Sequence, residues 1–231
     1  MKRFYKEVCV KTFDGGWQIA LDGRAMKTVK GAPQVVPTEP LAKALAAEWD
    51  AQGEKIDPAA MPLRDMADYA IDIVAPDPSA LIAKTVDYGD TDTLLYRADP
   101  DEPLYARQQE VWEPIVQSME ARLGAAFTRI SGIIHRPQSE EALGKLHEEL
   151  TKQSPFALTA IEMMTYLAAS LITGFSAAQS DADAQALWDA ANLEEDWQIE
   201  QWGRDEEAEE RRTKRNADFL KAREFWELAS A

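Results

Sequence analysis

The sequence predicts an α+β protein, in which a small antiparallel β-rich domain with two helices is followed by an all-α domain. Short β-rich runs separated by Asp-Gly turns fill the first 36 residues, and apolar residues then recur at helical spacing to the end of the chain. Two prolines, Pro76 and Pro78, interrupt the helical pattern. Because proline stops a helix and stiffens a connection, we place the boundary there and expect domains at residues 1–76 and 77–231.

The β-rich domain begins with four short strands that we expect to form an antiparallel meander. The strands are predicted at residues 6–13, 17–21, 24–29 and 34–36. The Asp-Gly turns at Gly15 and Gly23 suit tight hairpins, because glycine reaches positive φ without steric cost. The single cysteine, Cys9, excludes an intramolecular disulfide, and its place between Val8 and Val10 favours a small buried side chain.

The helices are predicted from capping residues and from apolar residues that share one face. Thr38 suits the N-cap of the first helix, in which Leu41, Leu45 and Trp49 recur every four residues. The remaining helices are predicted at residues 63–74, 79–88, 103–123, 139–153, 155–175, 181–191, 193–202 and 205–229. Gly124 and Gly174 stand where glycines that end helices are expected.

The most apolar stretch and the charge of the chain exclude several classes of protein. Residues 156–175 contain Glu162 and several hydroxyl side chains, so we interpret them as a buried core helix and expect no membrane insertion. The net charge of −16 disfavours nucleic-acid binding, which requires clustered lysine and arginine. Solubility alone explains this acidity, although it also permits a basic protein partner. No apolar segment follows Met1-Lys2-Arg3, so no secretory signal is visible and we expect a bacterial cytoplasmic protein.

The sequence lacks the residue patterns of known catalytic sites. Its two histidines, His135 and His147, do not stand in a metal-ligand spacing. There is no nucleophile elbow and no glycine-rich phosphate-binding loop, so we expect a protein that is not an enzyme.

One acidic cluster supports an alternative function. Asp87, Asp90 and Asp92 could bind Mg²⁺ or Ca²⁺ through their carboxylate oxygens, as in a divalent-metal-dependent enzyme. The simpler explanation is that Thr91 or Asp90 is the N-cap of the next helical turn.

Residues 193–207 combine large aromatic side chains with many carboxylates. Trp197 and Trp202 stand five residues apart in a predicted helix, so we expect one of the two to point outward. An exposed aromatic side chain with a rim of carboxylates suits a surface that binds Arg or Lys of a protein partner. The alternative is a solvated helix face, which the spacing of Glu207 and Arg211 supports. A general acidic adaptor with several basic partners is therefore a second alternative function.

Several segments, in order along nearly the whole chain, together carry a family resemblance. They are Arg3-Phe4-Tyr5; Leu21-Asp22-Gly23-Arg24 with Lys27-Thr28; residues 48–53 with Ile56-Asp57-Pro58 and Met61-Pro62-Leu63; residues 92–97 with Gln109 and residues 112–114; and residues 198–203. With them the chain resembles the assembly chaperone family that acts on the α subunit of the ATP synthase F(1) sector. Val29 departs from the family's pattern, in which a proline is expected after Lys27-Thr28.

The resemblance implies a two-domain chaperone, without cofactor or catalysis, that binds the unassembled α subunit and shields its β-facing surface. A monomer is expected, and eukaryotic relatives are expected in the mitochondrial matrix. The family's important acidic residue lies shortly after a Trp-Gly pair, and Glu206 is the residue at that place. The partner-binding residues that the resemblance implies are Gln198, Trp202, Gly203, Asp205, Glu206 and Glu207. At this stage Glu206 could act at the interface or hold the last two helices together.

Overall fold

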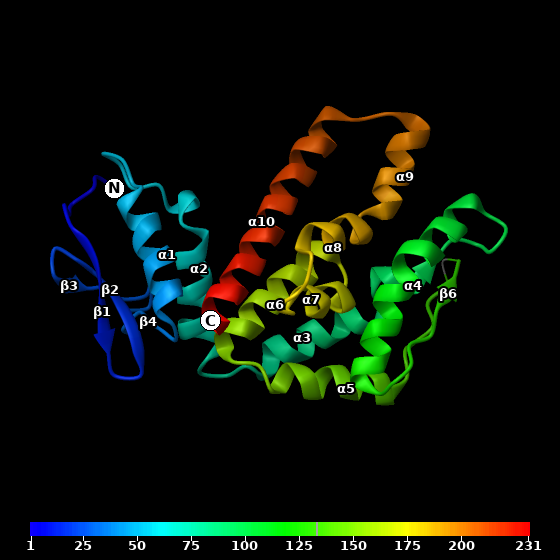
Figure 1. The fold of residues 1–231 in the computed structure, drawn as a ribbon, viewed down its shortest axis with the longest axis horizontal. Coiled ribbons are helices and arrows are strands. Elements are labelled where there is room, and N and C mark those ends of the chain that lie inside the picture. The colour runs from blue at the N-terminus through cyan, green and yellow to red at the C-terminus, as the bar shows by residue number, and fades with distance from the viewer. Residues whose placement is uncertain (133) are drawn as a thin grey trace. The chain divides into compact units, whose positions relative to one another are not determined.

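The computed structural model describes residues 1–132 and 134–231, and these residues pack into two compact units. Unit 1 contains residues 1–78, 153–160 and 224–231, and unit 2 contains residues 79–152 and 161–223 (Figure 1). The predicted α+β class is confirmed, since a small antiparallel sheet with a few helices precedes a helical part. The predicted domains, residues 1–76 and 77–231, are parts of the chain expected to fold independently. This division stays a prediction.

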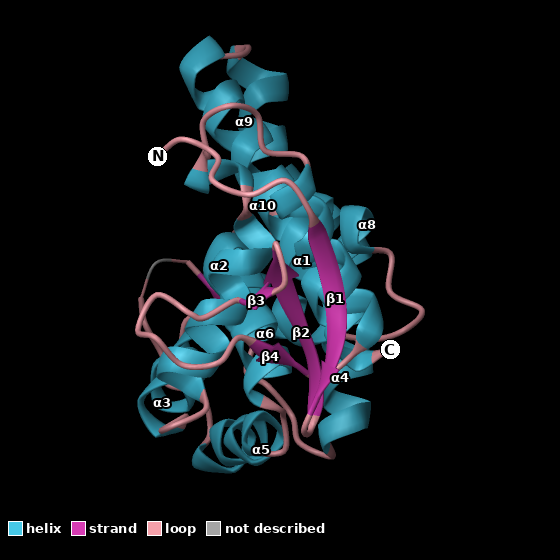
Figure 2. Cartoon of the chain, turned by 90° about the vertical axis from the view of Figure 1, so that its left-hand side faces the viewer, coloured by secondary structure: helices cyan, strands magenta, loops and turns pink. Residues whose placement is uncertain are grey.

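The sheet of unit 1 has four antiparallel strands, which Figure 2 shows in magenta. The strands are β1 (Val8–Phe13), β2 (Gly16–Leu21), β3 (Arg24–Ala25) and β4 (Val35–Val36). The predicted meander would place β4 beside β3, but β4 pairs with β2. This arrangement is possible because β3 is only two residues long and pairs with Ala20 and Leu21, which leaves Trp17 and Gln18 free to pair with β4.

The prediction of a buried Cys9 is wrong, because its side chain is exposed. β1 forms an edge of the sheet, and Val8 and Val10 are half-buried while Cys9 is exposed between them. Successive side chains of a strand point to opposite faces, so two apolar neighbours on one face put the residue between them on the other.

Two carboxylates, the buried Asp68 and the half-buried Asp72, fix the loop between β3 and β4 to the helices of unit 1. The Thr28 hydroxyl donates to Asp72 Oδ1 at 2.6 Å, and the Lys30 N–H donates to Asp72 Oδ2 at 3.0 Å. Gln34 Nε2 donates to Asp68 Oδ1 at 2.6 Å. Burial raises the pKa of the Asp68 carboxyl, although the hydrogen bond from Gln34 acts in the opposite direction. The loop is therefore held by one buried hydrogen bond, from Gln34 to Asp68, and by further hydrogen bonds that are nearer to the surface.

Thr38 caps the first helix of unit 1, as the sequence predicts. A glutamate side chain from that helix caps the start of a later helix. The helical elements here are α1 (Glu39–Asp50), η1 (Pro58–Ala60), α2 (Pro62–Tyr69) and the π-helical turn η2 (Ala70–Val74). Thr38 Oγ1 accepts from the Leu41 N–H at 3.2 Å and caps α1. Glu48, from the end of α1, accepts from the N–H groups of Leu63 and Arg64 at 2.8 and 2.9 Å, and so satisfies the start of α2.

Unit 2 is helical apart from one pair of two-residue strands. Its elements are α3 (Ser79–Asp90), η3 (Thr93–Leu95), β5 (Tyr96–Arg97), α4 (Pro103–Leu123), β6 (Ile130–Ser131), α5 (Glu140–Thr151), α6 (Pro155–Ala168), α7 (Leu171–Ala177), α8 (Ala184–Ala191), α9 (Leu193–Trp202) and α10 (Glu206–Ser230). α6 and α10 also contribute residues to unit 1. Gly124 adopts the left-handed conformation with φ +66° and ends α4 as predicted. In the part of the chain that the structure describes, no helix has both the length and the apolar character needed to cross a membrane.

The prediction of one helix over residues 155–175 is wrong, because two helices share this stretch. α6 ends at Ala168, and the next residue, Ala169, has φ +49°. The Ser170 hydroxyl then accepts from the Thr173 N–H at 2.9 Å and caps α7. Left-handed backbone at an alanine is strained, so contacts from elsewhere in unit 2 must hold this break.

The prediction that Gly174 ends a helix is wrong. Gly174 lies inside α7, at a close approach to α6. A Cβ atom at Gly174 would lie 2.3 Å from Thr165 Oγ1 and 3.1 Å from the Ile161 carbonyl oxygen. Both distances are shorter than ordinary van der Waals contact. The glycine therefore allows α7 to pack directly against the backbone of α6.

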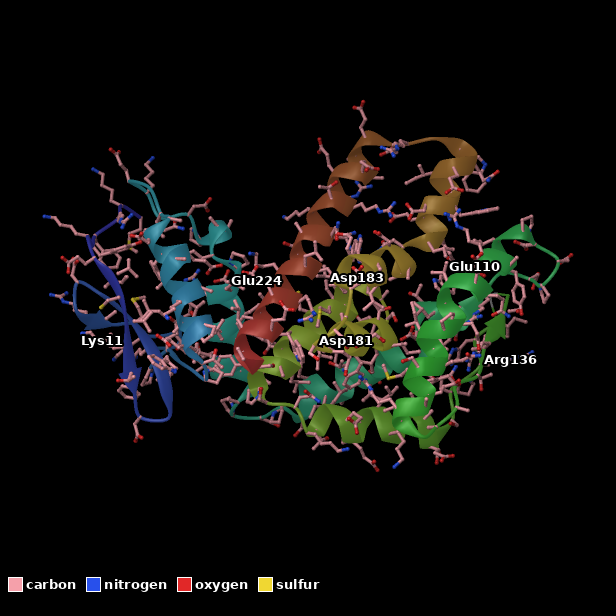
Figure 3. The ribbon with its side chains drawn as sticks, viewed as in Figure 1. Lys11, Glu110, Arg136, Asp181, Asp183 and Glu224 are labelled. Atoms are coloured by element: carbon pink, nitrogen blue, oxygen red, sulfur yellow. The ribbon has the colours of Figure 1, made fainter. Side chains whose placement is uncertain are left out.

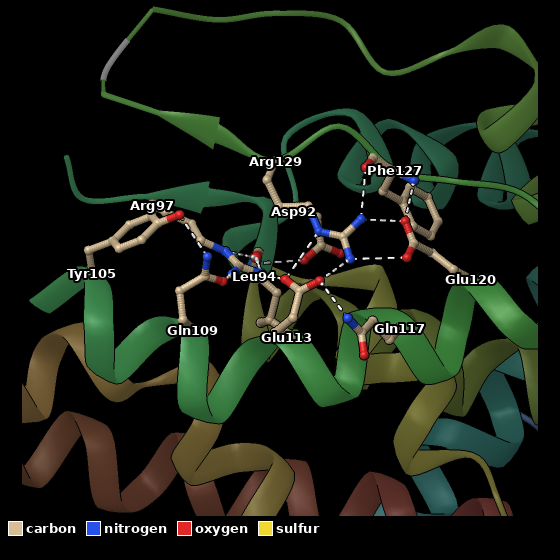
Figure 4. A network of polar contacts seen from close by, with 10 residues as sticks. All are labelled: Asp92, Leu94, Arg97, Tyr105, Gln109, Glu113, Gln117, Glu120, Phe127 and Arg129. Carbon is tan, nitrogen blue, oxygen red and sulfur yellow. Dashed lines mark hydrogen bonds and ion pairs between the residues drawn. The ribbon is translucent and has the colours of Figure 1, made fainter. Parts of the chain in front are cut away.

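An ion-pair network joins α4 to the strand pair of unit 2 (Figure 4). The buried Arg97 side chain contacts Glu113 at 2.9 Å and also donates to Gln109. Glu113 in turn pairs with Arg129 at 2.7 Å, and Arg129 also pairs with Glu120. Burial raises the pKa of Glu113, but the hydrogen bond and charge of Arg129, together with Arg97, outweigh it and hold that pKa below its ordinary value.

We expect Gly174→Ala to lower the free energy of unfolding by about 2 kcal/mol, because the added methyl group overpacks the contact with α6. Gly144→Ala is the matched control, since Gly144 also lies inside a helix but a Cβ atom there meets nothing within 4 Å. It should raise stability by about 0.5–1 kcal/mol through helix propensity. Urea denaturation followed by circular dichroism measures both changes. Equal effects of the two substitutions would contradict the close-approach role of Gly174.

Candidate functional site

The residues suggested for partner binding lie at the α9–α10 corner, which we define as residues 193–212. α9 ends at Trp202, α10 begins at Glu206, and three residues connect the two helices (Figure 1). Residues 193–212 contain nine carboxylates and three basic side chains, Arg204, Arg211 and Arg212. The corner therefore presents a concentrated negative charge.

Trp202 is the most exposed large apolar side chain of the corner. Its exposed fraction is 80%, whereas Trp197 is half-buried, which confirms that one of the two tryptophans points outward. The Gly203 N–H donates to the Ile199 carbonyl at 2.9 Å, and Gly203 has φ +89° and ψ 176°. Only glycine adopts this conformation readily. The chain consequently turns away directly after Trp202 and leaves the indole uncovered.

The three acidic residues after Arg204 have different local roles. Asp205 Oδ1 accepts from the Ala208 N–H at 2.8 Å, so Asp205 caps the start of α10. Glu206 and Glu207 are exposed in the first turn of the helix, where the helix dipole favours negative charge. Glu207 pairs with Arg211 at 2.7 Å, as its spacing predicts. Glu206 is not buried against an arginine, and this observation favours an interface role over a packing role.

The structure brings four of the six suggested residues together around one hollow of about 220 Å³. These are Gln198, Trp202, Gly203 and Asp205. Ile199 adds an apolar wall to the same hollow. Glu206 and Glu207 do not line the hollow and lie beside it on α10. The arrangement offers an exposed aromatic ring next to a small recess, surrounded by carboxylates.

Arg212 holds the two helices of the corner together, and the sequence reasoning did not identify it. Its half-buried guanidinium pairs with Asp196 and lies 3.9 Å from Glu195, both on α9. The hydrogen bond with Asp196 raises the pKa of Arg212. Arg212 belongs to a run of charged residues with the composition of a solvated face, and its partners lie sixteen and seventeen residues earlier. No local spacing rule connects residues that far apart.

Two neighbouring side chains of α4 bind carboxylates of α9. Arg107 pairs with Glu200 at 2.7 Å, and its guanidinium lies 5.9 Å from the centre of the Trp197 ring. The buried Gln108 donates to Glu194 at 2.7 Å. Burial raises the pKa of Glu194, and the hydrogen bond from Gln108 acts against this effect. These contacts hold α9 against α4, while Glu195 on α9 stays exposed to water.

Comparison with known proteins identifies the family of the chain. Residues 2–120 match the family described as ATP12 chaperone protein, which is just over half of the chain. The chain belongs to the ATP12 chaperone family.

Similarity to ATP12 proteins extends beyond the matched residues. The mitochondrial protein atp12 of Schizosaccharomyces pombe is 28% identical over 221 residues, which cover 90% of this chain and 76% of the relative. The crystal structure of Atp12 from Paracoccus denitrificans matches with a TM-score of 0.94 and 40% identity, over 99% of this chain and 98% of that one. A variant of the Paracoccus protein with lysine in place of one aspartate matches with the same TM-score and identity, over 99% and 97% of the two chains.

Membership of the ATP12 family identifies the general role of the protein. The family consists of chaperones for ATP synthase assembly, and a chaperone role implies a protein that is not an enzyme. The compartment of this ATP12-family protein and its monomeric state stay predictions.

In the cluster of Asp87, Asp90 and Asp92, two of the three carboxylates accept hydrogen bonds from backbone N–H groups. Asp92 is completely buried, and it, not Asp90 or Thr91, is the cap: its carboxylate accepts from the Leu94 N–H at 3.0 Å and from the Ile172 N–H at 2.9 Å. Asp90 accepts from the Gln138 N–H at 2.6 Å. Within residues 1–132 and 134–231, no group of three or more His, Cys, Asp or Glu side chains is placed to hold a metal ion.

His135 contacts two polar side chains, those of Tyr96 and Asp90. Its ring contacts the Tyr96 hydroxyl at 2.8 Å and the Asp90 carboxylate at 3.4 Å. His135 is exposed on a surface connection. Neither His135 nor Tyr96 lines the hollow of the α9–α10 corner, so these side chains are separate from the candidate binding surface.

We expect the stability that Asp92 contributes to fall as the pH rises from about 4 to about 6. Burial raises the pKa of Asp92 from 3.8 to about 6, although N–H groups that donate to the carboxylate oppose the effect. Between these values the folded chain keeps a proton that the unfolded chain has lost, so raising the pH destabilises the fold by up to about 3 kcal/mol. The difference in unfolding free energy between wild type and Asp92→Asn, measured in urea from pH 4 to pH 7, should show this decrease.

Asp87→Asn is the control for the pH series, because it removes an exposed carboxylate close by in the sequence. A wild-type advantage over Asp92→Asn that grows with pH would contradict the burial argument.

Proposed function

We propose that this protein binds the unassembled α subunit of the ATP synthase F(1) sector and shields its β-facing surface until assembly. The single observation that carries the proposal is the exposed Trp202 beside the hollow of the α9–α10 corner. Monomeric proteins rarely leave a large aromatic ring uncovered next to a recess unless a partner covers it. The family supports the assembly role, and the choice of subunit is our proposal.

A free subunit of an oligomer exposes the apolar interface that its neighbour will later cover, and such a surface tends to aggregate. A chaperone must cover that surface and leave when the neighbour arrives. This requirement favours modest affinity, which a wet and charged interface with few aromatic anchors provides. The α9–α10 corner has this composition, with one exposed tryptophan among nine carboxylates.

The carboxylates of the corner supply orientation and rate more than affinity. A negative patch attracts a basic surface over distances near a Debye length and rejects acidic surfaces. Because Asp205 caps α10 and Glu207 pairs with Arg211, Glu206 keeps an exposed carboxylate that can meet a partner's Arg or Lys. We therefore assign Glu206 to the interface and Gln198 and Gly203 to the shape of the recess.

We expect immobilised protein to capture purified α subunit, and not β subunit, at physiological salt, and Glu206→Lys to weaken this capture by about tenfold or more. Glu140→Lys is the matched control, since Glu140 is also an exposed first residue of a helix and loses the same interaction with the helix dipole. Circular dichroism confirms that both variants are folded. Capture of neither subunit by wild type would overturn the proposal, and equal losses in the two variants would remove Glu206 from the interface.

Trp202→Ala should weaken capture of the α subunit by about thirtyfold, because truncating an aromatic anchor typically costs about 2 kcal/mol. The loss should appear mainly as faster dissociation, which surface plasmon resonance measures. Tyr166→Ala removes another exposed aromatic side chain of unit 2 and serves as the control. Unchanged dissociation of Trp202→Ala would contradict an anchoring role for the indole.

A further inference from the structure

We propose that the groove between α4 and α8 is a docking site for a basic amphipathic helix of the client protein. The inference rests on the proposed function only for the identity of the protein that supplies this helix. The groove has a volume of about 660 Å³ and lies in unit 2. It is separate from the hollow of the α9–α10 corner, with which it shares no lining residue.

The walls of the groove are two helix faces with apolar residues at helical spacing. On α4 the lining residues include Val111 and Ile115, and on α8 they include Leu187 and Ala190. Val111, Ile115 and Leu187 are half-buried, so each still exposes part of its apolar surface. Two diverging helix faces of this kind accept a third helix whose side chains fill the space between them.

A buried hydrogen bond fixes the two helices below the groove. Trp112, which is completely buried, donates from its indole nitrogen to the Ala190 carbonyl at 2.7 Å. This bond holds the C-terminal end of α8 against α4. The groove is therefore already formed in the chain without a partner.

Pro114 breaks a rule of helix formation at this groove. It lies inside α4 and lines the groove. Proline has no N–H, so the Glu110 carbonyl, four residues earlier, lacks its helical donor. A proline inside a helix costs about 3 kcal/mol, and departures of this size from local preference are expected at functional sites.

The charges at the rim of the groove indicate the chemistry of the partner. Glu110, Asp181 and Asp183 are exposed carboxylates, two of which line the groove while Glu110 lies on α4 beside it (Figure 3). Asp183 also caps α8 by accepting from the Ala186 N–H at 3.0 Å. These carboxylates favour Lys or Arg on the docked helix.

One cation, Arg122, also lines the groove. Its guanidinium lies 5.3 Å from the centre of the Phe175 ring and contacts Met119 Sδ at 3.2 Å. Burial lowers the pKa of Arg122, although the charge of Glu149 opposes this. Arg122 thus closes one part of the wall by packing on apolar groups, and the rim keeps a negative balance.

Electrostatics distinguishes a client helix from a second copy of this chain. The net charge of −16 makes two copies repel each other at low and moderate salt. The apolar walls require a partner with an apolar stripe, and the acidic rim requires basic residues beside that stripe. A basic amphipathic helix meets both requirements, and the like charge of two copies disfavours a second copy of this chain.

Two double variants of the full chain test the groove by capture of purified α subunit at physiological salt. Ile115→Ser with Leu187→Ser removes the apolar walls, and Glu110→Gln with Asp181→Asn removes rim charge without changing the packing. The controls make the same types of change at exposed positions elsewhere in unit 2: Ile134→Ser with Tyr166→Ser, and Glu140→Gln with Glu141→Gln. Circular dichroism and urea denaturation show that each variant is folded.

We expect both groove variants to weaken capture by tenfold or more while the controls stay within twofold of wild type. If wild type captures the α subunit and the groove variants equal their controls, the groove inference is overturned and the proposed function stands. If wild type captures no α subunit, the proposed function fails, and a second probe decides about the groove.

The second probe is a synthetic Leu/Lys amphipathic peptide of about 14 residues, which spans about 20 Å as a helix. Fluorescence anisotropy should show saturable binding of one peptide per chain at physiological salt, with a tenfold loss in the groove variants alone. Absent binding, or equal binding by the groove variants and their controls, would overturn the inference.

Discussion

Unit 2 depends on how it compensates two buried charged groups, Asp92 and Arg97. A charged side chain without partners is strongly disfavoured in a protein interior. Asp92 accepts from backbone N–H groups at the start of η3 and of α7, so its carboxylate joins two segments about 80 residues apart. Arg97 pairs with Glu113 on α4, which also pairs with Arg129. These contacts help to set the positions of α4 and α7, and α4 supplies one wall of the groove.

Residues with local causes could be predicted from the sequence, and residues with distant causes could not. Thr38 and Gly124 act on their own helices, and both were predicted as caps. The break at Ala169 could not be found by periodicity, because a carboxylate far along the chain accepts from the first turn of α7. Gly174 was misread for the same reason, since the group that excludes a side chain there belongs to another helix. Cys9 shows the complementary error, in which apolar neighbours suggested burial although strand alternation required exposure.

The residues of the candidate site also differ in whether their roles have local or distant causes. The spacing of Trp197 and Trp202 was sufficient to predict that one indole is exposed, and the Trp-Gly pair located the acidic residues. The hollow beside Trp202 and the tie through Arg212 depend on the approach of two helices, which no spacing rule describes. Several motif residues that support the family resemblance, including Glu48, Thr28 and Arg97, satisfy buried polar groups. Their roles in holding the fold show that a residue can support the family resemblance without lying at the candidate site.

The exposure of Trp202 gives the molecule an optical property. Of its seven tryptophans, Trp202 alone is exposed, while Trp49, Trp112 and Trp188 are buried and the remaining three are half-buried. Its indole therefore emits from an aqueous environment, at longer wavelength than the indoles of the core. The surrounding carboxylates concentrate cations and repel anions, so a cationic quencher reaches this indole more readily than iodide does. Fluorescence from the native chain thus reports on the α9–α10 corner without an attached dye.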